Sequence, residues 1–154
     1  MRLIVAAVGR LGRGPEADLI AGFAARIDAG ARGCAFGPIQ IVEIDDRGRA
    51  GAEVAARLLR ASEGSYRVVL DERGAPRPSR AFAAELAARR DAGARAAAFL
   101  IGGADGHAEE TRAAADAVLG FGPMTWPHAL ARVMLVEQLY RAQTILAGGP
   151  YHRD

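Results

Sequence analysis

The feature that most constrains this fold is the alternation of short apolar runs with longer stretches of helical periodicity. Apolar runs bounded by glycine, proline or charged residues predict four buried strands, at residues 3–8, 39–44, 66–70 and 97–101. Apolar residues at helical spacing predict three helices between them, at residues 15–28, 50–63 and 79–91. Strands that alternate with helices favour an α/β fold, in which a mainly parallel sheet carries helices on both faces.

Individual residues indicate where these helices begin and end. Ser79 is a candidate N-cap of the third helix, because a serine hydroxyl can accept a hydrogen bond from the first turn. Gly30 and Gly93 lie just beyond the predicted ends of the first and third helices, where glycine is favoured. Residues 71–78, which contain two prolines, are predicted to form a loop.

The pattern changes after the fourth strand. A glycine-rich turn at residues 102–106 precedes a predicted helix at residues 107–119. Residues 120–128 are too interrupted by glycine and proline to form a long strand. The last predicted helix, at residues 129–147, is apolar on several faces, which favours burial on nearly all sides and contact with a second subunit. We expect all 154 residues to form one domain.

Composition sets the broad class of the protein but not its function. The net charge is only +2, and all twenty basic residues are arginine, as a GC-rich coding bias would produce, so charge alone does not indicate nucleic acid. Cys34 is the only cysteine, which excludes an internal disulfide and fits a reducing compartment. No apolar run approaches the roughly 20 residues of a membrane span. We therefore expect a soluble, cytoplasmic protein with no membrane partner.

Several common chemistries lack their motifs in this sequence. A Walker A loop requires a lysine, and the chain has none. His107, His128 and His152 are not at metal-ligand spacing, so we expect no metal. The serine-hydrolase elbow is absent, and the absence of a dinucleotide-binding fingerprint disfavours a nicotinamide-dependent oxidoreductase.

The glycine turn and the segment after it are candidates for a binding site. Turn 102–106 follows a strand and precedes a helix, where an α/β sheet places its ligands, although a plain tight turn fits the sequence equally well. Trp126 is interpreted either as a core residue, which we favour, or as part of a site. His128 is interpreted either as a structural cap of the last helix or as a functional side chain.

The end of the chain carries a second group of candidates. Glu137 and Arg141 are four residues apart in an apolar helix, which favours an ion pair held in a site or an interface. Tyr151, His152 and Arg153 would suit a lid over a nucleobase, through stacking and phosphate contact, although such tails usually fray.

Together these motifs resemble the ribosomal RNA large-subunit methyltransferase H family of the SPOUT class. The resemblance covers the whole chain and is most specific over residues 99–153. The residues that carry it are Met1–Leu3, Val8-Gly9, Leu70-Asp71, Leu100–Gly103, Thr125, Pro127-His128, Arg132, Glu137–Ala142 and Tyr151-His152.

The resemblance implies a fold, a reaction and a set of site residues. It implies a C-terminal trefoil knot at about residues 97–154, and S-adenosyl-L-methionine bound in that knot at a homodimer interface. It implies methylation of N3 of a pseudouridine in 23S rRNA, on the assembled ribosome and not on DNA. The implied cofactor contacts are Leu70, Gly103, Gly122, Pro123, Met124, Thr125, Trp126 and Pro127. The chain departs from the family at Gly122-Pro123, because Pro123 lacks the N–H that could bond the cofactor.

Methylation of N3 requires a base or a group that stabilises the delocalised anion. We expect Arg141 or Arg153 to stabilise that charge, His152 or His128 to handle the proton, and Tyr151 to pack on the base. The target base must be accessible, in a loop or flipped out. The alternatives are a SPOUT methyltransferase acting on tRNA, and a non-catalytic, ribosome-associated RNA-binding protein.

Overall fold

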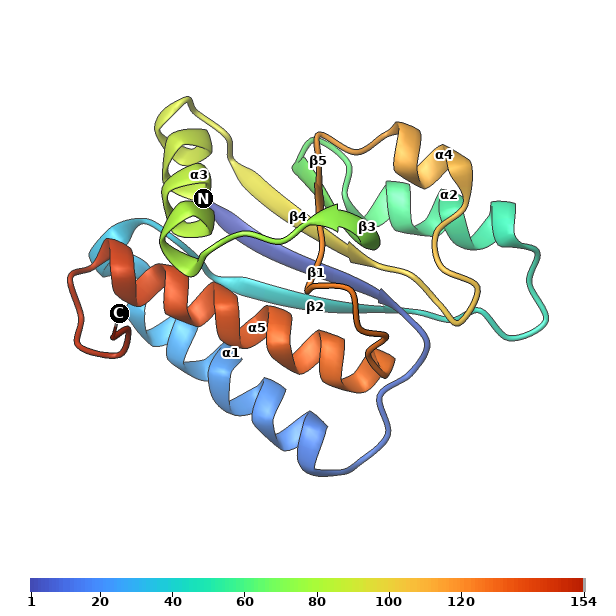
Figure 1. Ribbon diagram of the computed structural model, residues 1–154, viewed down its shortest axis with the longest axis horizontal. Helices are drawn as coiled ribbons and strands as arrows, with labels where there is room; N and C mark the ends of the chain where they lie inside the picture. Colours follow the sequence, from blue (N-terminus) through green and yellow to red (C-terminus); the bar gives the residue numbers. More distant parts are fainter. Residues whose placement is uncertain (154) are drawn as a thin grey trace.

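The fold is built on a five-stranded parallel sheet, seen in a computed structural model that describes residues 1–153 (Figure 1). The strand order is β2-β1-β4-β3-β5. The strands are β1 (Arg2–Val8), β2 (Ile39–Ile44), β3 (Tyr66–Ala75), β4 (Ala96–Ile101) and β5 (Ala117–Leu119). The helices are α1 (Pro15–Cys34), α2 (Gly51–Ala61), α3 (Ser79–Asp91), α4 (Glu109–Ala113) and α5 (His128–Leu146).

Helices cover both faces of this sheet. Successive side chains of β1 point to opposite faces, so Leu3 and Ile4 belong to different apolar clusters. The Leu3 cluster includes Leu139 of α5 and residues of α1 and α3, and the Ile4 cluster includes Leu58 of α2. Figure 1 shows α1 and α5 lying side by side beneath the sheet, with α2 and α4 on its other side. The expected parallel α/β fold is confirmed.

Helix α1 continues six residues past its predicted end at residue 28. Gly30 lies inside α1, where a Cβ atom would come within 2.6 Å of Gln143 Oε1 on α5. The prediction of a helix end at Gly30 is therefore wrong, because this glycine allows two helices to approach closely. Gly93 follows α3 with a φ of +91°, as its predicted position beyond the helix end requires.

Two further boundaries differ from the prediction around α3. Pro78, not Ser79, is the N-cap of α3, and the Ser79 hydroxyl instead donates a 2.8 Å hydrogen bond to Gln138 Oε1. Strand β3 extends to Ala75, so part of the segment predicted as a loop is strand.

The predicted helix over residues 107–119 is wrong. Only Glu109–Ala113 is helical, and Ala117–Leu119 forms β5 beside β3. Asp116 directs this change, since its carboxylate accepts a 2.7 Å hydrogen bond from Arg67 N and its N–H donates to Arg67 O at 2.9 Å. A three-residue strand is stabilised by such tertiary pairing more than by its own propensity.

Beyond β5 the chain passes in close contact with the end of β3. A Cβ atom on Gly74 would lie 2.5 Å from Gly120 N, and one on Gly120 would overlap the carbonyl of Gly74. Only glycine fits at both positions. From this crossing, residues 120–127 lead to α5. Within residues 1–153, no helix is long and apolar enough to cross a membrane.

Candidate functional site

A pocket of about 390 Å³ lies at the carboxyl ends of three adjacent strands. Its walls come from the second half of β3, from the segments that follow β4 and β5, and from the first turn of α5. This is the edge at which parallel α/β sheets bind their ligands. The residues that form its walls are 70–73, 101–107, 112, 119, 121–122, 124–126, 128 and 131.

Most of the residues expected to contact the cofactor face this pocket. Those that line it are Leu70, Gly103, Gly122, Met124, Thr125 and Trp126, whereas Pro123 and Pro127 do not. Trp126 is 38% exposed, and its indole N–H donates to Phe121 O at 3.4 Å, so its interpretation as a core residue is wrong. His128 also lines the pocket and makes no capping hydrogen bond, so its interpretation as a structural cap is wrong.

Glycines bring the backbone to the pocket surface. The turn at residues 102–106 is closed by a 3.0 Å hydrogen bond from Gly106 N to Gly103 O. A Cβ atom on Gly102 would lie 2.8 Å from the Gly106 carbonyl, and one on Gly103 would press on Val8 at 3.1 Å. Gly122 has a φ of +92°, which L side chains rarely adopt. Backbone groups can therefore approach a ligand closely here.

A polar group that the sequence analysis missed fixes the wall formed by β3. The carboxylate of Asp71 accepts hydrogen bonds from Arg73 N at 3.0 Å and from Arg112 Nε at 3.1 Å. These bonds, with the nearby charge of Arg112, lower the pKa of Asp71. The imidazole of His107 lies 3.1 Å from Leu70 O. Leu70-Asp71 was part of the family pattern, but its partners, Arg112 of α4 and His107, are visible only in the fold.

A buried arginine anchors the first turns of α5 to the sheet. Arg132 is 2% exposed, and its guanidinium donates to the carbonyls of Val8 and Gly9 at 3.2 Å and to Glu43 Oε1 at 3.1 Å. Burial lowers the pKa of this guanidinium, while the charge of Glu43 opposes that shift. Glu43 also accepts a 2.7 Å bond from Leu11 N. Arg132 therefore joins α5 to the ends of β1 and β2.

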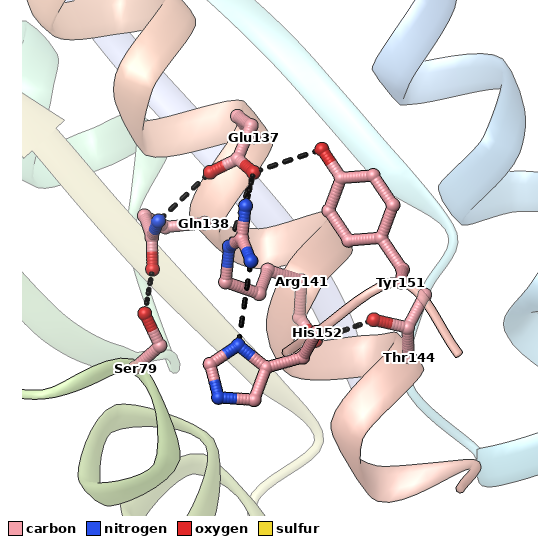
Figure 2. Close-up of polar contacts among 7 residues, drawn as sticks. All are labelled: Ser79, Glu137, Gln138, Arg141, Thr144, Tyr151 and His152. Carbon is pink, nitrogen blue, oxygen red and sulfur yellow. Dashed lines mark hydrogen bonds and ion pairs between the residues drawn. The ribbon is translucent and has the colours of Figure 1, made fainter. Parts of the chain in front are cut away.

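A second group of polar side chains lies toward the other end of α5. We call it the tail cluster: Ser79, Glu137, Gln138, Arg141, Thr144, Tyr151 and His152 (Figure 2). Glu137 is its centre, since Oε1 accepts from Arg141 at 2.6 and 3.1 Å and from the Tyr151 hydroxyl at 2.9 Å. Its other oxygen accepts from Gln138 at 2.8 Å. The expected Glu137–Arg141 ion pair is present, and it is held within this network.

The tail is ordered by these contacts. The Arg141 guanidinium stacks on the Tyr151 ring at 4.8 Å and lies 3.3 Å from His152 Nδ1. Tyr151 also packs edge-on against Tyr140. Desolvation and its bond to Glu137 raise the pKa of Tyr151, so the phenol stays protonated at neutral pH. Arg153 is exposed.

The fold brings three of the five predicted catalytic residues together and separates them from a fourth. Arg141, Tyr151 and His152 meet in the tail cluster. His128 lies in the pocket at the start of α5, roughly 20 Å from Arg141 at 1.5 Å per helical residue. A second hollow of about 440 Å³ between α3 and α5 runs from Gly122 to Glu137. Across residues 1–153, no three His, Cys, Asp or Glu side chains are grouped so as to hold a metal ion.

Comparison with known proteins identifies the family. The family described as "Predicted SPOUT methyltransferase" matches residues 1–152. A protein of Phenylobacterium zucineum named "Ribosomal RNA large subunit methyltransferase H" is 50% identical over the full length of both chains. Proteins of the same name from Caulobacter sp. and Dinoroseobacter shibae are 51% and 52% identical over at least 99% of both chains.

The chain belongs to the ribosomal RNA large subunit methyltransferase H family. The family resemblance inferred from the sequence motifs is thereby confirmed. Membership makes this chain a methyltransferase with the SPOUT fold, and the parallel sheet and strand-end pocket described above are its framework.

Proposed function

We propose that this protein transfers a methyl group from S-adenosyl-L-methionine to N3 of a pseudouridine in 23S rRNA, on the assembled ribosome. The observation that carries the proposal is that Leu70, Gly103 and residues after β5 all line the same pocket. The full-length relatives named for large-subunit rRNA support the choice of substrate.

The pocket fits a methyl donor of this kind. S-adenosyl-L-methionine supplies an electrophilic methyl group when bound. Gly102 and Gly103 would let the backbone approach it, and Leu70 and Thr125 would contact it from neighbouring walls. Pro123 cannot donate a hydrogen bond, but it does not line the pocket, so its missing N–H leaves the fit intact.

The tail cluster supplies groups that suit an acidic N–H acceptor. N3 of pseudouridine lies between two carbonyl groups, so the charge that develops on its deprotonation spreads onto their oxygens. Arg141 carries a fixed positive charge for that anion, and Glu137 holds its guanidinium in one orientation. Tyr151 presents an aromatic ring beside Arg141, where a flat base can stack.

The geometry also restricts how His152 can handle the proton. Arg141 Nη1 can only donate, so Nδ1 of His152 accepts and the neutral ring carries its hydrogen on Nε2. Protonation of Nδ1 would break the Arg141 contact. A role for Nδ1 as the base therefore requires that Arg141 release it, for example toward the substrate.

We further propose a trefoil knot and a homodimer whose tail cluster acts on the partner's pocket. The close crossing of Gly74 and Gly120 supports a chain that threads past the β3 segment. Four large apolar side chains that are at least 38% exposed suit a second subunit: Leu19, Met124, Trp126 and Leu130. The separation of His128 from Arg141 favours action across the dimer.

The test is methylation of ribosomes from a strain that lacks this activity, followed by mass spectrometry of the digested rRNA. N3-methylpseudouridine in the large-subunit RNA is the expected product. Methylation of tRNA instead would move the substrate to the first alternative. Loss of both methylation and donor binding, measured by calorimetry, would leave a non-catalytic RNA-binding protein.

A further inference from the structure

The most unusual residue beside the pocket is His107, which the proposed chemistry does not use. It follows the 102–106 turn and precedes α4, and it is only 5% exposed. Its Nε2 lies 3.1 Å from Leu70 O, and its Nδ1 is buried with no hydrogen-bond partner within residues 1–153. A buried polar atom without a partner costs stability, so a purely structural side chain here would be better apolar.

The hydrogen bond of His107 determines which ring nitrogen carries the hydrogen. A carbonyl oxygen only accepts, so Nε2 carries the hydrogen and donates to Leu70 O. Burial lowers the pKa of His107, which keeps the ring neutral at neutral pH, although the backbone of Leu70, the carboxylate of Asp71 and the backbone of Leu100 favour the charged ring. Arg112 of α4, which is paired with Asp71, disfavours the charged ring.

Leu70 lies on β3 between the last residues of the two neighbouring strands that border the pocket. It pairs with Ile101 of β4 on one side and with Leu119 of β5 on the other. His107, which donates the hydrogen bond to Leu70 O, directly follows the glycine turn. The residues of that turn line the same pocket as Leu70. This bond therefore ties the end of the turn to the middle of β3.

We propose that His107 is a positioning residue for the methyl donor: its Nε2–H holds Leu70 O and the 102–106 turn in the geometry that S-adenosyl-L-methionine requires. The inference rests on the proposed function, since it assumes that the methyl donor binds this pocket. Within the turn the local closure is the bridge between Gly103 and Gly106, with a 3.0 Å hydrogen bond from Gly106 N to Gly103 O, so the bond from His107 adds a tie from the end of the turn to β3.

The test compares His107→Leu with His107→Gln in the full-length protein. Leucine removes the donor and the unpartnered nitrogen, whereas the glutamine amide retains an N–H donor. Calorimetry with S-adenosyl-L-methionine and with S-adenosylhomocysteine should show affinity weakened about tenfold or more in the leucine variant. The glutamine variant should stay within about threefold of the wild type, and the melting temperature of the leucine variant should not fall.

A readout without ligand separates this inference from the proposed function. Hydrogen exchange of the free protein should be faster at residues 102–106 in His107→Leu than in the wild type or His107→Gln. Leucine-variant affinity within twofold of the wild type overturns the inference, as does a parallel loss of affinity and melting temperature, which indicates a structural role. If the wild type binds no methyl donor, the proposed function is wrong, and so is the role of His107 in positioning that molecule. Hydrogen exchange would still report whether His107 orders the turn.

Discussion

At the residue scale, Glu137 organises the tail cluster. Its carboxylate accepts hydrogen bonds from Arg141, Tyr151 and Gln138, and its side chain is 18% exposed. Charge-assisted bonds of this kind hold an arginine in a fixed orientation. In the proposed function Arg141 is the residue that meets the substrate, and Glu137 is the residue that holds Arg141 in its orientation.

Glu137→Gln should therefore lower kcat by about tenfold to a hundredfold, because the neutral amide holds the guanidinium less firmly against the developing charge. Affinity for the methyl donor should stay unchanged, since Glu137 does not line the pocket at the strand ends. Single-turnover methylation of ribosomes measures the first quantity and calorimetry the second. Glu63→Gln, at an exposed position on another part of the chain, is the matched control. Equal kcat in both variants would contradict this role.

The buried imidazole of His107 predicts a pH-dependent stability. Its pKa in the folded protein lies below the value of about 6.5 in the unfolded chain. As pH falls below about 6.5, the unfolded chain therefore binds a proton that the folded protein does not, and the free energy of unfolding decreases. The contribution of His107 is fully present above that pH and is lost progressively toward its folded pKa.

Denaturant unfolding of the wild type and His107→Leu between pH 8 and 5 measures this effect. The stability of the wild type relative to the leucine variant should fall as pH decreases across this range. The depressed pKa of Asp71 acts in a separate window, below its ordinary value of 3.8, and so does not overlap. A difference that does not change with pH would show that folding leaves the pKa of His107 unchanged, and a difference that grows as pH falls would show that folding raises it.

At the scale of elements, glycines control how closely segments approach. Gln143 of α5 donates 2.7 Å hydrogen bonds to the carbonyls of Ile27 and Phe36, and its amide fills the space beside Gly30. A methyl group at Gly30 would push the amide away from both carbonyls. The residue that looks like a helix stop in the sequence is a contact between helices.

Gly30→Ala should destabilise the protein by about 1–3 kcal/mol, as overpacking of a well-filled interior does. Gly33→Ala is the control, because it lies in the same helix with open space around its Cβ position. There the higher helix propensity of alanine should be neutral or stabilise by up to about 1 kcal/mol. Chemical denaturation of both variants decides the point, and a stabilised Gly30→Ala protein would contradict the close approach.

The chain segments that cross at Gly74 and Gly120 approach more closely than the two helices do at Gly30. Backbone, not a flexible side chain, occupies the space that a Cβ atom on Gly74 would need. Gly74→Ala should therefore destabilise the fold by about 3 kcal/mol or more, or prevent soluble expression. Gly12→Ala, with open space around its Cβ position, should leave the melting temperature unchanged. Comparable melting temperatures for the two variants would rule out a crossing this close.

An element can be predicted from the sequence when the residues that stabilise it are neighbours in the chain. The four longer strands and the helix α5 are marked by long apolar runs, which the sequence displays directly. Strand β5 has three residues and forms because Asp116 pairs with Arg67, forty-nine positions earlier in the chain. No local pattern reports such a pairing. For the same reason, a single helix was predicted over residues 107–119, where the structure has the short helix α4 and the strand β5.

At the scale of the whole molecule, the fold divides the candidate site into two parts. The residues of the family pattern predicted the pocket positions Leu70, Gly103 and Thr125, which meet only because β3, β4 and β5 end at one edge of the sheet. The contacts of Arg112 and Arg132 could not be predicted, although Arg132 belongs to the family pattern, since each side chain bonds to groups from distant strands. Sequence motifs predict candidate residues for the chemistry, and the topology determines which of these candidates are neighbours.

This division makes a prediction about mixed dimers. Gly103→Leu should disable the pocket, because a side chain there would press on Val8 and enter the wall. Arg141→Ala should disable the tail cluster. If each tail acts on the partner's pocket, a heterodimer of the two variants holds one intact pocket opposite one intact tail. Random reassortment of equal amounts should then restore about a quarter of wild-type activity, although each variant alone is inactive.

The same mixture gives a different result if each tail serves its own subunit's pocket along the hollow between α3 and α5. Every site in the heterodimer would then contain one lesion, and mixing would restore nothing. Differently tagged subunits, refolded together and purified on both tags, ensure that only heterodimers are assayed, and their activity should be about half that of the wild type. A heterodimer of wild type and a doubly mutated chain is the converse case, because it should be inactive if tails act across the dimer and about half as active as the wild type if they act within their own subunit. The length of α5 between His128 and Arg141 is the reason to expect restoration.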